Sequence, residues 1–291
     1  MILIIESGAT KTQWVAVEPE GKGQVEVKTA GINLASMSGP VVEGIVNEAV
    51  EALQKGGLAD KISEVHFYAA GLVTKAGEAV PDLASGLDKV FKCVFPDAGI
   101  EYASDLLAAA RSVCGHAPGI AAILGTGSNS CSFDGEEIVR NIRPGGFILG
   151  DEGGGARLGK LFISDFIKGL VPEPLATEFA ADFEVDYLSV VKNVYKGGAP
   201  AGYLGSFAPW IAARYDSSDY IKSMVDSNFR DFIERCLRQY DLGRLPVGVV
   251  GGFGYANRDV LRKVAEPYGI VFSTIISAPA EGLIDYHLGR K

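Results

Sequence analysis

One local pattern opens each half of this 291-residue chain: a buried strand, a turn of small residues and a second strand. The first copy reads IIESGATKTQW from Ile4 to Trp14, and the second reads AAILGTGSNSCSF from Ala121 to Phe133. The elements after each copy also recur in the same order, although few residues are identical. A repeat of this kind indicates a weak internal duplication. We therefore expect two domains of similar topology.

Hydrophobic periodicity and turn residues predict the element order β-β-β-α-β-α-β-α in both halves. In the first half we expect strands at 2–5, 13–18, 24–30, 64–69 and 100–103, and helices at 41–54, 77–91 and 105–114. The first three strands form a predicted antiparallel meander. In the second half we expect strands at 120–124, 130–133, 137–142, 247–250 and 270–273, helices at 258–265 and 279–288, and a helical insertion at 156–239.

This order predicts an α/β protein with domains at 1–115 and 116–278, and with the C-terminal helix at 279–291 packed back on the first domain. The 27 Lys and Arg residues against 36 Asp and Glu leave a net charge of −9, which disfavours nucleic acid and anionic membranes as partners. The four cysteines stand alone and only three histidines occur, so zinc and disulfide scaffolds are disfavoured. Without a basic leader or a long apolar run, a cytoplasmic protein is expected.

Two glycine-containing turns occupy equivalent places in the repeat. Residues 6–12 carry the hydroxyls of Thr10 and Thr12, and residues 124–130 carry Gly125-Thr126-Gly127. Backbone N–H groups in such turns can approach phosphate oxygens. The first is not a Walker A loop, because a strand follows it, and taken alone it is equally an ordinary hairpin turn. The pair predicts two phosphate clamps that face each other across a cleft between the domains.

Two further glycine-rich segments lie in the second half. Residues 144–155 contain six glycines around Asp151-Glu152, which is typical of a Mg²⁺ or sugar-hydroxyl site, although a surface loop with two solvated acids is the alternative. Residues 249–255 contain Gly251 and Gly252 after a predicted strand. They would let an adenine or ribose lie against the backbone, or they form a simple turn between strand and helix.

Asp105 follows the predicted strand 100–103 and opens a helix. An N-cap aspartate is common at such a place. The carboxyl end of a sheet strand is also where open α/β folds bind ligands, so a general base is the other interpretation. A base with an ordinary pKa would be ionised at pH 7.

Taken in order, the four turns and Asp105 resemble the sugar-kinase/heat-shock-ATPase/actin superfamily. The chain is most similar to its N-acetylglucosamine kinase branch, which is grouped with the activator ATPases of benzoyl-CoA reductase. The runs ILGTGSNS and GGFILGDEGGG are the most specific part, and Glu6 stands where that branch often has Glu. The resemblance covers nearly the whole chain. It implies two ribonuclease H-like (actin-like ATPase) domains with a cleft between them.

The resemblance implies an ATP-dependent kinase that phosphorylates the 6-hydroxyl of an amino sugar, N-acetylglucosamine first, with Asp105 as the general base. It implies ATP contacts at Gly8, Thr10, Lys11, Thr12, Gly125, Thr126, Gly127, Gly251 and Gly252. It implies sugar contacts at Asn33, Asn129, Gly146, Phe147 and Asp151. Glu6 and Asp151 would orient Mg²⁺ through water. A homodimer is a further expectation from the resemblance.

Some residues depart from the branch and leave alternatives open. Phe147 stands where the animal enzymes have Trp, and Ala69-Ala70 stand where those enzymes offer a serine hydroxyl. The substrate could therefore be glucosamine or N-acetylmuramic acid. The zinc motif of the ROK kinases is absent. Rival functions on the same fold are an activator ATPase, which would need a cysteine-ligated cluster, a non-catalytic sugar sensor and an actin-like filament protein.

Overall fold

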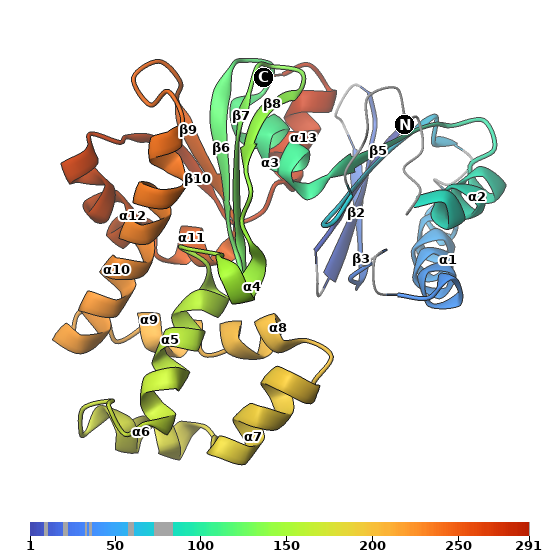
Figure 1. Cartoon of the computed structure of the whole chain (residues 1–291). Helices are drawn as coiled ribbons and strands as arrows, with labels where there is room; N and C mark the ends of the chain where they lie inside the picture. The colour runs from blue at the N-terminus through green and yellow to red at the C-terminus, as the bar shows by residue number, and fades with distance from the viewer. Residues whose placement is uncertain are drawn as a thin grey trace. The chain divides into compact units, whose positions relative to one another are not determined.

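The computed structural model describes residues 1–8, 11–19, 23–32, 34, 37–57, 61–72 and 84–290, and Figure 1 shows the elements along the chain. The strands are β1 (Ile2–Ser7), β2 (Lys11–Val17), β3 (Gln24–Ala30), β4 (Glu64–Ala69), β5 (Gly99–Ser104), β6 (Gly119–Leu124), β7 (Ser128–Phe133), β8 (Ile138–Ile142), β9 (Val247–Val250) and β10 (Phe272–Ile276). Helices α1 (Gly39–Lys55), α2 (Ser85–Val94) and α3 (Asp105–Cys114) lie in the first half, and α13 (Ala280–His287) closes the chain.

The other helical elements follow β8. They are α4 (Gly146–Leu149), α5 (Gly155–Ile167), α6 (Leu175–Asp182), α7 (Tyr187–Val191), η3 (Lys192–Lys196), α8 (Pro200–Gly205), α9 (Ala208–Ala212), α10 (Asp219–Arg235), η4 (Leu237–Gln239), α11 (Gly252–Ala256), α12 (Arg258–Ala265) and η5 (Glu266–Tyr268). None of the helices in the described residues is both long enough and apolar enough to cross a membrane.

The contacts divide the chain into two compact units. Unit 1 comprises Met1–Ala117, Gly135–Glu137 and Pro279–Lys291, and unit 2 comprises Pro118–Asp134 and Ile138–Ala278. Within the described residues, each unit contains one mixed five-stranded sheet with helices packed on it. The α/β fold predicted from the sequence is therefore confirmed.

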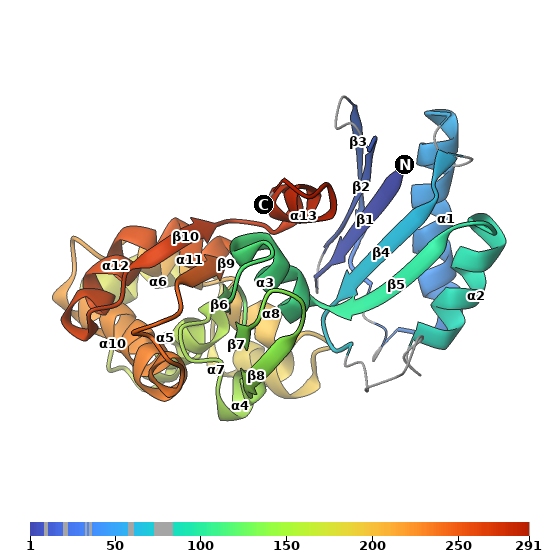
Figure 2. The ribbon, with the colours of Figure 1, turned by 90° about the horizontal axis from the view of Figure 1, so that it is seen from above.

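The sheet of unit 1 has the order β3-β2-β1-β4-β5. The strands β1, β2 and β3 form the predicted antiparallel meander, whereas β1, β4 and β5 run parallel. Alternation along β1 separates two cores: Leu3 and Ile5 face one, and Ile2 and Ile4 face the other. Figure 2 shows α1 and α2 on one side of this sheet and α13 on the other.

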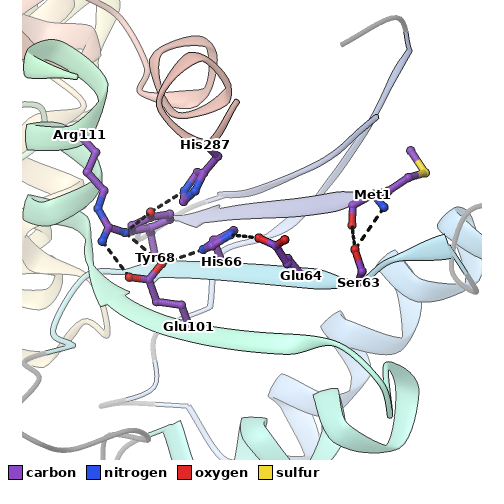
Figure 3. Close-up of polar contacts among 8 residues, drawn as sticks. All are labelled: Met1, Ser63, Glu64, His66, Tyr68, Glu101, Arg111 and His287. Atoms are coloured by element: carbon purple, nitrogen blue, oxygen red, sulfur yellow. Dashed lines mark hydrogen bonds and ion pairs between the residues drawn. The ribbon is translucent and has the colours of Figure 1, made fainter. Parts of the chain in front are cut away.

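A polar network holds α3 and α13 on the second face of this sheet (Figure 3). Arg111 binds both carboxylate oxygens of Glu101, at 3.0 and 2.9 Å, and donates to the Tyr68 hydroxyl at 2.6 Å. The Tyr68 proton is therefore directed at Nε2 of His287, 2.8 Å away, so His287 is neutral. Burial, followed by the charge of His66 stacked on its ring, lowers the pKa of His287 to about 3.

The sheet of unit 2 has the order β10-β9-β6-β7-β8. This is the order of unit 1 when β6 to β10 are matched to β1 to β5, and the strand directions match as well. The internal duplication is thus present in the fold. Between β8 and β9 the chain inserts the helices α4 to α10, and α5, α10 and α12 bury their apolar faces in the main core of unit 2.

Element bounds differ from prediction mainly beside the turns and at the last strand. Ser7 on β1 pairs with Thr12 on β2, so backbone pairing carries both strands into the polar turn. The strand predicted at 270–273 lies at Phe272–Ile276, paired in parallel with β9. Helix α2 begins at Ser85, and the start predicted at residue 77 lies outside the described residues. At the strand ends, pairing with a neighbouring strand outweighed the local residue pattern.

Candidate active site

The first turn of unit 1 is supported by a hydroxyl pair beneath it. Ser7 and Thr12 are fully buried, and their hydroxyl oxygens lie 2.7 Å apart. Oγ of Ser7 also donates to the Ile32 carbonyl at 3.1 Å and accepts from the Ile32 N–H at 2.8 Å. Either hydroxyl can donate the proton between the two oxygens, so the ATP contact of Thr12 stays a prediction.

The other residues predicted around this turn have different surroundings. Gly8 closes the turn with its N–H on the Lys11 carbonyl, 3.0 Å away, and the Lys11 side chain is exposed. Thr10 and Asn33 lie outside the described residues. Ser7 forms two hydrogen bonds with the backbone of Ile32 and so fixes its position, and Ile32 directly precedes Asn33. Sequence reasoning missed Ser7, although a small polar residue at the end of an apolar strand is a usable signal.

Asp105 begins α3 directly after β5 ends at Ser104. Ser104 is the N-cap, and its hydroxyl accepts the Leu107 N–H at 3.1 Å. The interpretation of Asp105 as the cap is therefore wrong. The Asp105 carboxylate accepts a bond from the Leu106 N–H, but burial outweighs this and raises its pKa. The ordinary pKa expected from the sequence is thus corrected upwards.

Glu6 on β1 is affected by the charge of Asp105. Burial, followed by the negative charge of Asp105, raises the pKa of Glu6 to about 7, while Lys11 opposes this rise. The two carboxyl groups stand at the same end of the unit 1 sheet, and the charge of Asp105 disfavours ionisation of Glu6. A positive charge beside them would be favourable.

The second turn, in unit 2, is built against the start of α5. The Gly155 N–H donates to the Gly125 carbonyl at 2.9 Å, and the Ala156 N–H donates to the Thr126 carbonyl at 2.8 Å. A Cβ on Gly154 would lie 3.0 Å from the same Thr126 oxygen. Two glycine segments that were recognised separately in the sequence are thus one hydrogen-bonded structure.

The fourth glycine segment also packs on the second turn. Gly251 has φ of 130°, and a Cβ there would collide with the carbonyl oxygen of Leu124. A Cβ on Gly254 would meet the Leu124 side chain at 2.8 Å. Gly252 has open space around it. The glycines of this segment therefore serve close backbone approach, and only Gly252 leaves room beside the backbone.

Asp151 and Glu152 are adjacent in sequence but have different surroundings. Asp151 is buried with φ of 57°, accepts the Ser128 N–H, and lies where a Cβ on Gly127 would meet its Oδ2 at 2.8 Å. Burial raises its pKa. Glu152 instead forms ion pairs with Arg157 at 3.6 Å and Arg235 at 3.2 Å. Asp151 therefore belongs to the second turn, and Glu152 belongs to the supporting structure.

Two residues that the sequence analysis did not single out hold this region in place. Asn228 on α10 is fully buried, accepts the Gly153 N–H at 3.1 Å and donates to the Gly154 carbonyl at 3.2 Å. Lys160 on α5 donates to the Phe147 carbonyl at 2.6 Å. An amide within the apolar face of an amphipathic helix is a signal that could have identified Asn228.

The remaining predicted sugar contacts lie on β7 and α4. Asn129 is the second residue of β7, and its Oδ1 accepts the Ser130 N–H at 2.9 Å. Gly146 opens α4 with φ of 72°, and the Phe147 side chain packs partly against the unit 2 core. Unit 2 thus brings the second turn together with Asn129 and Asp151. Unit 1 brings Glu6 together with Asp105.

Comparison with known proteins gives matches among solved structures. No protein-family model matches the chain, and no curated protein matches it either. A protein of Porphyromonas gingivalis proposed to be an N-acetylglucosamine kinase is 37% identical, with a TM-score of 0.88 over 99% of both chains. A similarly described protein of Chromobacterium violaceum is 19% identical, with a TM-score of 0.69 over 97% of this chain and 96% of that one.

A hexokinase of Schistosoma mansoni, in complex with glucose, shares the fold at 12% identity, with a TM-score of 0.52 over 99% of this chain and 85% of that one. The duplicated sheets, with glycine turns after β1 and β6, therefore define a protein with the actin-like ATPase fold of sugar kinases. At 37% identity over almost its whole length to the P. gingivalis protein, the chain belongs to the N-acetylglucosamine kinase-like family.

Proposed function

We propose that this protein transfers the γ-phosphoryl group of ATP to the 6-hydroxyl of an amino sugar, with N-acetylglucosamine as the favoured substrate. The observation that carries the proposal is the placement of Asp105. Its carboxylate stands at the carboxyl end of β5, and capping of α3 is performed by Ser104 instead. Burial raises its pKa, which strengthens it as an acceptor for the hydroxyl proton.

In this proposal the glycine turns position the nucleotide. Phosphoryl transfer depends mainly on positioning and charge neutralisation. The proposed phosphate contacts are Gly8, Thr10, Lys11 and Thr12 in unit 1, and Gly125, Thr126 and Gly127 in unit 2. The contacts of Gly154 and Gly155 on the Gly125–Gly127 backbone support this role, because they make the turn rigid before any ligand binds. Gly252, with open space beside it, is the better of the two proposed adenosine contacts.

Magnesium fits the carboxylates that the structure presents. Glu6 and Asp151 are oxygen donors whose pKa values are raised by burial, and the charges of Lys11 and Lys160 only partly oppose this rise. Carboxylates and water are the ligands that Mg²⁺ prefers. We propose that Glu6 and Asp151 orient the ion through water. When bound, Mg²⁺ would neutralise charge on the β- and γ-phosphates, and Asp105 would accept the sugar proton.

The sugar contacts proposed are Asn33, Asn129, Gly146, Phe147 and Asp151. The identity of the sugar depends partly on Phe147, whose backbone is held by Lys160. Glucosamine and N-acetylmuramic acid are the alternative substrates in the same class. The activator-ATPase function would need surface cysteines that hold a cluster, and among the four thiols only Cys93 is exposed, while Cys131 and Cys236 are buried.

The test is ADP release from Mg-ATP with a panel of N-acetylglucosamine, glucosamine, N-acetylmannosamine, N-acetylmuramic acid and glucose. Sugar-dependent release with one amino sugar is the expected result. Asp105→Asn should lower kcat by about 10²–10⁴-fold while sugar and nucleotide still bind. Asp97→Asn, a change of an exposed acid in the same unit, is the control and should leave kcat unchanged. ADP release that is equal with and without every sugar would refute the kinase proposal.

A further inference from the structure

Asn129 and Asn141 form an amide pair on neighbouring strands of unit 2. Asn129 lies on β7, and Asn141 lies on β8 opposite Cys131. Nδ2 of Asn141 is 2.8 Å from Oδ1 of Asn129. The same Nδ2 is 2.8 Å from the Ser130 carbonyl and 3.3 Å from the Ile142 carbonyl. Asn141 is thereby fastened to the backbone of both strands.

The hydrogen-bond polarity of this pair is determined by backbone groups that cannot reverse their roles. The Ser130 N–H only donates, so the Asn129 atom that faces it at 2.9 Å must be oxygen. The carbonyls of Ser130 and Ile142 only accept, so the Asn141 atom that faces them must be nitrogen. The two assignments are independent and agree at the contact between the amides. A flipped amide at either position would oppose two like groups.

These assignments leave the Nδ2 group of Asn129 in a different environment from its Oδ1 atom. Its Oδ1 is saturated by the Ser130 N–H and by Asn141, whereas its Nδ2 has no hydrogen-bond partner among the residues that the structure describes. Asn129 is partly exposed, and it adjoins Ser128, whose N–H binds the Asp151 carboxylate. Asn129 therefore presents two N–H donors, and no acceptor, one residue after the backbone N–H that binds the proposed sugar-binding carboxylate.

We propose that Asn141 is a positioning residue that fixes Asn129 as a pure donor, so that the sugar group bound there is an oxygen acceptor and not an amine. This inference rests on the proposed function. A carbonyl or hydroxyl oxygen accepts the Asn129 protons, whereas the ammonium of an amino sugar would place donor against donor. The geometry thus favours sugars that present oxygen at this position, and it assigns Asn141 a role in specificity without contact to the sugar.

A double-mutant cycle tests the coupling. Kinetics would be measured for the wild type, Asn129→Ala, Asn141→Ala and the double variant, with sugar and ATP varied separately. Asn141→Ala should raise the sugar KM by about 3–10-fold, with the ATP KM changed by less than about twofold. In the Asn129→Ala background the same change should have almost no further effect, because the two residues act as one unit. Val139→Ala, an exposed change on the same strand, is the matched control.

A variant that replaces the outward donors of Asn129 by an acceptor gives a second test. Asn129→Asp keeps an acceptor toward the Ser130 N–H and Asn141 but replaces the outward donors by a carboxylate oxygen. The ratio of kcat/KM for glucosamine to that for N-acetylglucosamine should therefore rise at least about tenfold. Additive effects in the cycle, or an unchanged ratio, would overturn the inference while the kinase function stands. Absence of sugar-dependent ADP release by the wild type would overturn the proposed function and this inference with it.

Discussion

The two units share one sheet topology, but they support their glycine turns by different means. In unit 1 the turn between β1 and β2 rests on side-chain hydroxyls, because Ser7 binds both Thr12 and the backbone of Ile32. In unit 2 the turn between β6 and β7 rests on backbone that approaches closely at Gly154 and Gly251. Two domains with the same sheet topology can therefore stabilise the equivalent turn through different interactions.

The insertion explains part of this difference. The second turn receives the start of α5 and the amide of Asn228 on α10, which come from the helices between β8 and β9. Among the described residues of unit 1, the helix α1 lies between the corresponding strands β3 and β4. The insertion therefore supplies the support from Gly154 and Asn228, whereas the support from Gly251 comes from the segment after β9.

The largest effect on stability is expected at the close backbone contact of unit 2. Gly251→Ala places a Cβ against the Leu124 carbonyl at φ of 130°, so we expect a loss of about 3 kcal/mol. Urea unfolding would measure the change. Gly252→Ala is the matched control in the same turn, because nothing lies within 4 Å of its Cβ, and a change of about 0.5 kcal/mol or less is expected there. Equal losses in both variants would contradict the backbone support.

A smaller loss is expected when the hydroxyl support of unit 1 is removed. Ser7→Ala leaves the buried N–H of Ile32 without its partner at 2.8 Å, which should cost about 2 kcal/mol. The control is Ser63→Ala, because Ser63 is exposed and its hydroxyl forms only long bonds to Met1, at 3.3 and 3.5 Å. If Ser7→Ala unfolds at the same urea concentration as its control, the unit 1 turn does not depend on Ser7.

A pH dependence of the free energy of unfolding is expected in unit 1. The folded pKa of His287 is about 3, below its unfolded value of about 6.5, so the unfolded chain binds the extra proton between these values. Its contribution is complete above about pH 6.5 and is lost as the pH falls towards 3. The free energy of unfolding should fall by up to about 1.4 kcal/mol per pH unit in that window. His287→Gln should remove this part of the slope.

Measurement of the wild type and His287→Gln across this window isolates the effect, because the carboxylates titrate in both. His116→Gln is the control in the same unit, since His116 is exposed. The His287→Gln curve should be flatter than the other two. Three curves of equal slope would show that the network in Figure 3 does not hold His287 neutral.

Several elements were predictable because their signals are local. The bounds of β4, α3, β9 and α12 agree with those expected from residue periodicity and turn residues. The strand predicted at 270–273 begins two residues later and ends three residues later, at Phe272–Ile276, because parallel pairing with β9 determines its register. The roles of Asp105 and the sugar contacts remain predictions. The cap at Ser104 was missed because Ser and Asp are equally good caps in sequence.

The sequence by itself determined the repeated element order, the glycine turns and the family, because these depend on periodicity and on short motifs. Only the tertiary structure decided that Asp151 joins the second turn while Glu152 turns to Arg157. It also decided the direction of the Asn129 amide. The physical reason is that hydrogen-bond polarity and close approach depend on partners far away in the chain, such as Asn228 for Gly153, 75 residues apart.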